Sequence, residues 1–300
     1  MDMPQQMQRD YKELIEEHIL DFLPDIDHKS ITLYESMKYS LTAGGKRIRP
    51  MLLLAASEFA GGKLREAIPY ACAIEYIHTY SLIHDDLPAM DDDQLRRGRP
   101  TNHIVYGDAM AILAGDGLQS AAFEAMSKDM FLYFDNGDKL KKRIRAANEI
   151  VKGSGCRGMV AGQVADIESE NRACSGEMLD YIHLTKTAAL IVAAIRAGAQ
   201  LGGAKEEMLT NLTIYAENLG LAFQIADDIL DVIGSEEEMG KKTGVDTAKK
   251  KSTYPGIYGL EASKEKLMEL TDNAIQALAS YYDNAEFFVK LAEDLAVRGK

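Results

Sequence analysis

Two clusters of aspartate residues have the residue types and spacing that could carry chemistry. In the first, Asp85 and Asp86 are followed by Asp91–Asp93 across a short segment that contains Pro88. Because proline disfavours helical geometry at the residue before it, Asp85 and Asp86 are expected in the last turn of a helix. Carboxylates there oppose the helix dipole at a cost of about 0.3–1 kcal/mol each, which a bound cation would remove. A solvated acidic loop is the alternative interpretation of this cluster.

The second cluster consists of Gln224, Asp227, Asp228 and Asp231. Spacings of three and four residues place these side chains on one side of a helix. The opposite, core-facing stripe is expected to contain Ala222, Ile225, Ala226, Ile229 and Ile233. Mg²⁺ usually takes one or two carboxylates from a protein and completes its shell with water and substrate phosphates. Two aspartate clusters that face each other are therefore expected to hold several Mg²⁺ ions around one diphosphate.

Basic residues near the two clusters could bind the phosphate oxygens. Arg96 and Arg97 follow the first cluster directly, and the planar guanidinium group suits phosphate geometry. Lys46 and Arg49 stand just before a helix that is expected to begin at Pro50, where free amide groups attract anions. A solvated turn is the alternative there. Further candidates, each of which could singly be a surface lysine or a core histidine, are Lys186, Lys241, Lys251 and His78.

The overall composition excludes one class of partner. The 300 residues carry 47 acidic and 34 basic side chains, for a net charge of −13, so the chain lacks the positive charge on which nucleic-acid binding depends. The cysteines have no metal-ligand spacing and fit reduced thiols. The first residues do not resemble a signal peptide, and no apolar run approaches the ~20 residues that span a bilayer. We therefore expect a cytoplasmic protein without stable membrane insertion.

Helical periodicity dominates the elements that must position these residues. The segment Glu177–Leu201 is apolar nearly all round from Ala188 to Ala194, which is typical of a helix in the middle of a bundle. Other helices are expected over 8–22, 50–60, 67–86, 110–128, 139–152, 207–232, 264–280 and 285–297. The sequence therefore predicts an all-α fold, with residues 1–300 as a single domain of roughly ten helices.

In its aspartate clusters and basic segments the chain resembles the trans-isoprenyl diphosphate synthases, and most of all the bacterial farnesyl diphosphate synthases. The resemblance is carried by Gly44-Gly45-Lys46, Asp85-Asp86-x4-Asp91, Asp227-Asp228-x2-Asp231 and Ser252-Thr253-Tyr254-Pro255. It implies one polyprenyl synthetase domain of the isoprenoid synthase type with a deep central cavity, Mg²⁺ as the cofactor with three ions per active site, and a homodimer. The implied substrates are isopentenyl, dimethylallyl and geranyl diphosphates.

The resemblance also implies a role for each candidate site residue. The metal ligands would be Asp85, Asp86, Asp91 and Asp227, with Asp231 behind them. The allylic diphosphate would be bound by Arg96, Lys186 and Lys241, with Lys251 as a further substrate-binding candidate. Isopentenyl diphosphate would be bound by Lys46, Arg49, His78 and Arg97, with Arg298 as a terminal cation near it. The carbocation would be stabilised by Thr187 and Gln224.

The implied reaction is a head-to-tail condensation through an allylic carbocation. The allylic carbon–oxygen bond ionises, the double bond of isopentenyl diphosphate attacks the cation, and the released diphosphate takes the final proton. Tyr80 lies five residues before Asp85, or ~7.5 Å along a helix. Its ring, with the small Ser81 beside it, is expected to stop the growing chain at (2E,6E)-farnesyl diphosphate. Geranyl and geranylgeranyl diphosphate are the alternative products.

Three other interpretations remain open on the sequence alone. His84-Asp85 also matches the His-Asp pair of the helical HD-type metal phosphohydrolases, although that class leaves the second cluster without a role. Terpene cyclases share a first aspartate motif, but their second metal motif normally mixes Asn or Asp with Ser or Thr and Glu. An acidic helical interaction protein, or an inactive regulatory subunit, would bind diphosphates without turnover.

Overall fold

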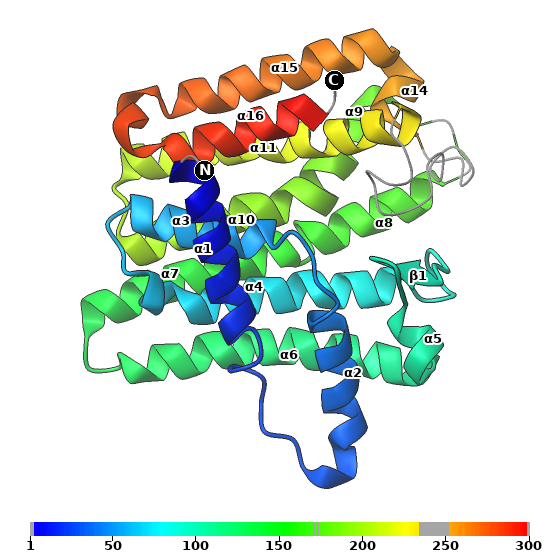
Figure 1. The fold of residues 1–300 in the computed structure, drawn as a ribbon, viewed down its shortest axis with the longest axis vertical. Helices are drawn as coiled ribbons and strands as arrows, with labels where there is room; N and C mark the ends of the chain where they lie inside the picture. The colour runs from blue at the N-terminus through cyan, green and yellow to red at the C-terminus, as the bar shows by residue number, and fades with distance from the viewer. Residues whose placement is uncertain (1–2, 171, 173, 234–251, 299–300) are drawn as a thin grey trace.

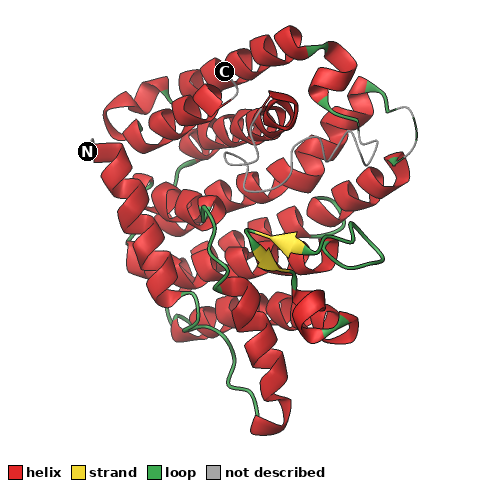
Figure 2. Ribbon diagram, turned by 45° about the vertical axis from the view of Figure 1, so that its right-hand side comes forward, coloured by secondary structure: helices red, strands yellow, loops and turns green. Residues whose placement is uncertain are grey.

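The computed structural model describes residues 3–170, 172, 174–233 and 252–298 of the chain. This part of the chain consists almost entirely of helices, which confirms the predicted all-α fold (Figures 1 and 2). A small hairpin is the exception within it, where Leu95–Arg96 (β1) pairs antiparallel with Arg99–Pro100 (β2). Gly98 turns this hairpin with a φ of 74°, a conformation that suits a residue without a side chain.

The long helices lie side by side in layers. In chain order they are α1 (Met3–His18), α2 (Ile31–Leu41), α3 (Ile48–Phe59), α4 (Leu64–Asp85), α5 (Asn102–Tyr106), α6 (Asp108–Leu132), α7 (Gly137–Ser154), α8 (Met159–Ser169), α9 (Gly176–Ile182), α10 (Ala189–Gly202), α11 (Glu206–Ile233), α14 (Tyr254–Tyr258), α15 (Leu260–Ala277) and α16 (Glu286–Arg298). A π-helical turn, His183–Ala188, joins α9 to α10. Short 3₁₀ turns occupy His28–Ser30 and Ala279–Asn284.

Every predicted helix is present, with ends that differ by a few residues. The helix predicted over 8–22 is α1, and the one predicted over 110–128 is α6. The sequence analysis missed α2, α5, α8 and α14. Five residues in each of α5 and α14 are too few for a periodic pattern. Helix α8 begins within the glycine-rich stretch 153–162, whose helix propensity is low.

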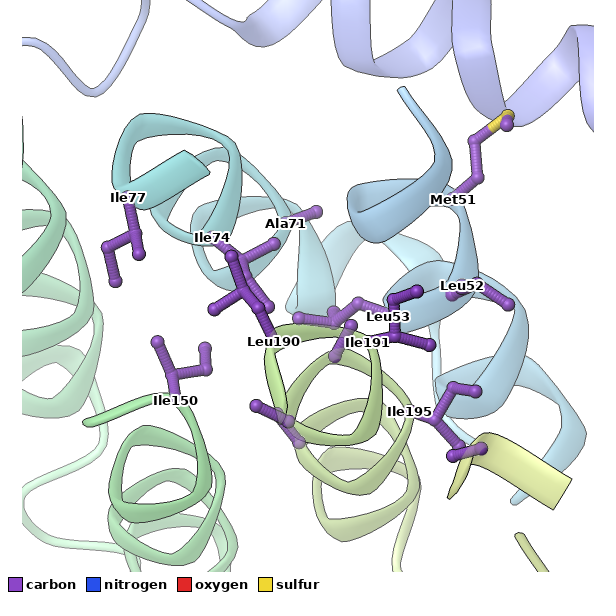
Figure 3. Packing of buried hydrophobic residues seen from close by; sticks show 14 of the residues in the cluster. Met51, Leu52, Leu53, Ala71, Ile74, Ile77, Ile150, Leu190, Ile191 and Ile195 are labelled. Atoms are coloured by element: carbon purple, nitrogen blue, oxygen red, sulfur yellow. The ribbon is translucent and has the colours of Figure 1, made fainter. Parts of the chain in front are cut away.

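The middle of the bundle is occupied by α10, which packs against α3, α7 and α11. Figure 3 shows its apolar side chains between those of its neighbours: Leu190, Ile191 and Ile195 lie against Leu53 of α3, Ile74 of α4 and Ile150 of α7. All of these side chains are buried, and full burial stabilises the fold by about 1.5–3 kcal/mol for each side chain of this size. The predicted central helix is therefore confirmed.

One described segment, Gly176–Gly202, is long and apolar enough to cross a membrane. Core helices meet the same criteria, and half of its most apolar stretch is buried inside the bundle. Gly198 shows how closely this helix packs, because a Cβ atom there would collide with the carbonyl oxygen of Leu53 on α3. In this structure the segment therefore serves as the core helix of the bundle.

The carboxyl-terminal ends of α4 and α11 lie at the same side of the bundle, beside the hairpin of β1 and β2 (Figure 1). The apolar stripe of α11 faces the core as predicted at Ala222, Ile225, Ala226 and Ile229. Ile233, the last residue of α11, is an exception, because it is 42% exposed. The fold thus brings the two aspartate clusters to one end of the molecule.

Candidate active site

In the first aspartate cluster, Asp85 is the last residue of α4 and Asp86 follows it as the cap. Asp86 is buried, and Arg96 of β1 donates to both of its carboxylate oxygens, with Nε 2.9 Å from each of them. Burial raises the pKa of the Asp86 carboxyl group, while the Arg96 guanidinium acts in the opposite direction. Asp86, a predicted metal ligand, and Arg96, a predicted diphosphate ligand, are therefore bound to each other in this structure.

The loop after α4 folds back over Asp85. The backbone N–H of Asp91 donates to the carbonyl oxygen of Asp85 at 2.8 Å, and Asp92 adopts a left-handed conformation with a φ of 53°. Burial raises the pKa of the Asp85 carboxyl group; the charge of Lys186 opposes this shift and the charge of Asp91 adds to it. Asp85, Asp91 and Lys186 are thus close enough to affect one another, as residues of a single site would be.

The second cluster lies on the last turns of α11, where its carboxylates have different surroundings. Asp228 is buried, and it accepts hydrogen bonds from the backbone N–H of Tyr254 at 2.9 Å and from Gln224 Nε2 at 3.2 Å. Asp231 is also buried, and its Oδ1 has no hydrogen-bond partner among the described residues. Asp227 is half-buried. Asp228 therefore anchors the start of α14, a role that the sequence did not indicate.

A polar cavity of about 230 Å³ lies between the two clusters. Its walls come from the loop after α4, from α8, from the π-helical turn and from α11. Five of the predicted site residues line it, namely Asp91, Arg96, Lys186, Thr187 and Gln224. Asp228 of the second cluster lines it too, and so do residues that the sequence analysis did not find, among them Asp166, Glu170 and His183. The structure thus brings residues from most of the predicted motifs around one space.

Lys186 and Thr187 lie on the π-helical turn, a feature that is frequent at functional sites. Lys186 Nζ is 2.6 Å from Oδ2 of Asp166 on α8, and the Thr187 hydroxyl donates to Gln224 Oε1 at 2.9 Å. Gly162 lets α8 approach this turn, because a Cβ atom there would collide with the backbone of Lys186. The only sequence signal for Asp166 was its place after this glycine, on a helix that was not recognised.

The carboxylates suit a metal ion that binds together with a diphosphate. Within the described parts of the chain, no three carboxylate, imidazole or thiol side chains converge closely enough to hold an ion alone. Mg²⁺ needs only one or two protein carboxylates when water and phosphate oxygens supply its other ligands. Asp231 Oδ1 has no hydrogen-bond partner in the part of the chain that the structure describes, and burial raises the pKa of Asp85. A nearby cation would stabilise both carboxylates.

Arg49, His78 and Arg97 form a basic group beside the two clusters. Arg49 Nη1 is 3.4 Å from His78 Nε2. Burial, followed by the charge of Arg49, lowers the pKa of His78 well below its usual value, so the neutral ring accepts this hydrogen bond. Arg97 donates to the carbonyl oxygen of Gly44, and Asp227 acts on Arg49 electrostatically. The structure therefore places this group next to both the glycine-rich loop and the second cluster.

The other predicted cations are placed less closely. Lys46 is exposed and lines a separate cavity of about 370 Å³ between α1, α3, α11 and α16. Arg298 ends α16, and the structure describes its backbone only. Lys241 and Lys251 lie outside the described residues.

An apolar cavity of about 330 Å³ begins beside the aspartates and extends between α4 and α8. Its α4 wall includes Tyr80 and Ser81, and its α8 wall consists of Met159, Val160, Gln163, Val164 and Ile167. Tyr80 is 7% exposed, its hydroxyl has no partner among the described residues, and its ring meets the edge of His84 at 5.7 Å. Lys186 and Thr187 line this cavity as well as the polar one. A diphosphate with a long apolar chain matches the two adjoining cavities.

Comparison with known proteins connects this geometry to one family. A sequence model described as polyprenyl synthetase matches residues 30–287. The chain is 48% identical over 258 residues to a farnesyl diphosphate synthase of Bacillus subtilis, with 86% of each chain covered. It is 46% identical over 274 residues to a geranylgeranyl diphosphate synthase of Cyanophora paradoxa, which covers 91% of this chain and 89% of that one. Among solved structures, an FPP/GFPP synthase of Zymomonas mobilis matches with a TM-score of 0.85, 33% identity and 98% coverage of both chains.

Proposed function

We propose that this chain, which belongs to the polyprenyl synthetase family and is thus a trans-prenyltransferase, makes (2E,6E)-farnesyl diphosphate. It does so by condensing dimethylallyl or geranyl diphosphate with isopentenyl diphosphate. Membership of this family sets aside the HD-type phosphohydrolase and terpene cyclase hypotheses. Membership of the family does not determine the product length, since farnesyl and geranylgeranyl diphosphate synthases are similar to this chain to nearly the same degree. The observation that carries the fifteen-carbon product is the position of Tyr80 in the wall of the apolar cavity.

In this proposal the carboxylates of the two clusters hold Mg²⁺ at the diphosphate. The ligands are Asp85, Asp86, Asp91 and Asp227, with Asp231 behind them. When bound, Mg²⁺ neutralises the negative charge of the departing diphosphate. The Asp86 carboxylate, to which Arg96 donates, keeps further lone pairs that could bind the ion.

The allylic diphosphate is bound by Arg96 and Lys186, each of which now contacts a carboxylate. Phosphate oxygens accept from the same nitrogen atoms in place of Asp86 and Asp166, so the cations remain paired throughout. The resemblance adds Lys241 and Lys251 to this proposed set. Because Thr187 donates its hydroxyl proton to Gln224, the lone pairs of the Thr187 oxygen are left to stabilise the positive allylic carbon.

Isopentenyl diphosphate is bound by Lys46, Arg49 and Arg97, with neutral His78 beside Arg49. The allylic carbon–oxygen bond breaks and its electron pair leaves with the diphosphate. The terminal double bond of isopentenyl diphosphate then forms the new carbon–carbon bond. A proton is lost to the released diphosphate, which restores a double bond. The apolar walls of α4 and α8 keep water from the carbocation.

Tyr80 limits the product in this proposal. It stands on α4 five residues before Asp85, which is ~7.5 Å along the helix axis, and its ring is part of the same cavity wall. Ser81 beside it leaves space for the chain. A twenty-carbon product is the second candidate, which the identity to the Cyanophora paradoxa geranylgeranyl diphosphate synthase favours.

We further propose a cytoplasmic homodimer with a single polyprenyl synthetase domain in each chain. Helix α6 exposes Ile112, Leu113 and Phe123, whose exposed fractions are 45%, 53% and 37%, and large exposed apolar side chains often mark a protein contact. A second copy of the chain would cover them. The cysteines Cys72, Cys156 and Cys174 are free, as expected in a reducing compartment.

The decisive experiment is product analysis. Purified protein is incubated with dimethylallyl and isopentenyl diphosphates and Mg²⁺, and the dephosphorylated products are separated by chain length. A fifteen-carbon alcohol that disappears with EDTA supports the whole proposal. A longer main product would keep the reaction and overturn the role of Tyr80. A folded protein that gives no condensation would contradict the proposed activity.

A further inference from the structure

We propose that Arg47 is a positioning residue for the loop between α2 and α3, which carries Lys46 and leads to Arg49. Arg47 joins this loop to the N-terminal helix α1 and to α4. This inference rests on the proposed function, in which Lys46 and Arg49 bind isopentenyl diphosphate. Arg47 lies between them in the chain, but its side chain points into the protein and not toward a substrate.

Arg47 is 2% exposed, and its guanidinium contacts three separate elements. Its Nε donates to Glu16 Oε1 of α1 at 2.8 Å, and its Nη1 donates to Glu75 Oε1 of α4 at 2.6 Å. Its Nη2 donates to the carbonyl oxygen of Leu41, at the end of α2, at 2.6 Å. Buried charged groups are stable only when they are paired and hydrogen-bonded. Arg47 meets this condition inside the protein, so its guanidinium is not available to bind a phosphate.

The backbone of Arg47 requires such support. It caps α3 in the left-handed region, with φ 52° and ψ 34°, where residues with a side chain are rare. A conformation of this kind persists when surrounding contacts enforce it. The turn directs the chain so that exposed Lys46 precedes it, while Arg49 falls in the first turn of α3. The contacts of Arg47 therefore determine the relative placement of the two substrate-binding cations.

The contact with α4 extends this effect to His78. Glu75 is three residues before His78, about one turn along the same helix. Arg47 thus links the loop to the helix that carries His78, and Arg49 is 3.4 Å from that ring. Arg49 and His78 line the apolar cavity together with Asp85. The hydrogen bonds of Arg47, however, go to Glu16, Glu75 and the carbonyl oxygen of Leu41, which are not residues proposed to bind the allylic diphosphate. Loss of the Arg47 contacts should therefore weaken binding of isopentenyl diphosphate and leave binding of the allylic substrate intact.

Two variants test this separation, namely Glu16→Gln, which removes one carboxylate from the partly exposed side, and Arg47→Lys, which keeps the charge and loses the branched hydrogen bonds. Glu17→Gln, at the exposed neighbouring position of α1, is the matched control. Initial rates are measured with each substrate varied in turn, and equilibrium binding of isopentenyl diphosphate and thermal unfolding are measured in parallel. We expect the KM for isopentenyl diphosphate to rise about tenfold or more in both variants, because small misplacements of binding groups have effects of this size.

The pattern across the two substrates decides the outcome. A rise confined to isopentenyl diphosphate, with the KM for geranyl diphosphate within about twofold and Glu17→Gln unchanged, supports the positioning role. Equal rises for both substrates, or no rise for either in a folded Glu16→Gln protein, would overturn it. If Arg47→Lys does not fold, Glu16→Gln alone decides. Absence of condensation in the unmodified protein would contradict the proposed function and not this coupling, which the binding measurement tests separately.

Discussion

Replacing Tyr80 with alanine tests whether its ring ends the growing chain. The ring lies ~7.5 Å along the α4 axis from Asp85 at the helical rise per residue, and it lines the apolar cavity between α4 and α8. Without the ring, this part of the cavity wall would leave room for a longer chain. We therefore expect the main product of Tyr80→Ala to lengthen from fifteen to twenty carbons.

The same replacement should cost less stability than the loss of an ordinary buried aromatic residue. Removing a well-packed aromatic side chain lowers the free energy of unfolding by about 3–5 kcal/mol. Tyr80, however, buries a hydroxyl group that has no hydrogen-bond partner among the described residues, and an unsatisfied group of this kind costs about 1–3 kcal/mol. The ring also borders a cavity on one side. The net loss should therefore be about 2 kcal/mol, and the variant should remain folded.

Tyr80→Phe is the matched control, because it removes the hydroxyl and keeps the ring. It should retain the fifteen-carbon product, with a free energy of unfolding that is unchanged or higher by about 1 kcal/mol. Products are separated by chain length after dephosphorylation, and stability is measured by urea unfolding. If folded and active Tyr80→Ala still releases only the fifteen-carbon product, the ring does not set the length and the role given to this cavity wall is wrong.

Three further measurements test the site. Burial lowers the pKa of His183 to about 4, below its usual value of about 6.5. The neutral ring therefore contributes its full stability above pH ~6.5. As the pH falls to ~4, up to about 3 kcal/mol of this stability is lost. Urea unfolding should show a shallower decline in His183→Gln, and an equal decline would refute this source. Asp228→Ala leaves the N–H of Tyr254 without its acceptor and should lower the free energy of unfolding by about 1–3 kcal/mol; an unchanged Tm would contradict the anchoring role. EDTA should abolish condensation and added Mg²⁺ should restore it, whereas full activity in EDTA would remove the metal from the proposal.

The features that the sequence could predict are those that repeat along one helix. Pro88 and the apolar stripe before it were enough to place Asp85 and Asp86 at the end of α4, because both signals are local. Spacings of three and four did the same for the cluster on α11. Asp166 could not be found in this way, since its relation to Lys186 depends on how α8 packs on the π-helical turn.

The sequence also did not indicate which partner each basic side chain would bind. A cation near an aspartate motif can bind the aspartate or the substrate, and residue type alone does not distinguish these outcomes. Arg96 was predicted to bind a phosphate and is bound to Asp86 in the structure. Arg47 lies in the same short run as Lys46 and Arg49, yet its contacts are with α1, α2 and α4. Both assignments require the tertiary contacts.

The π-helical turn at His183–Ala188 lies between α9 and the part of α10 that packs in the core. Successive residues of an α-helix are rotated by about 100°, so one inserted residue rotates the residues beyond it by that angle relative to those before it. The cavity-facing side at Lys186 and Thr187 and the core-facing side at Leu190 and Ile191 are thereby set out of phase with α9. Deleting one residue from the turn would restore a regular helix and rotate one side away from its position. The insertion therefore lets the residues that face the cavity and those that pack in the core vary independently along the same helix.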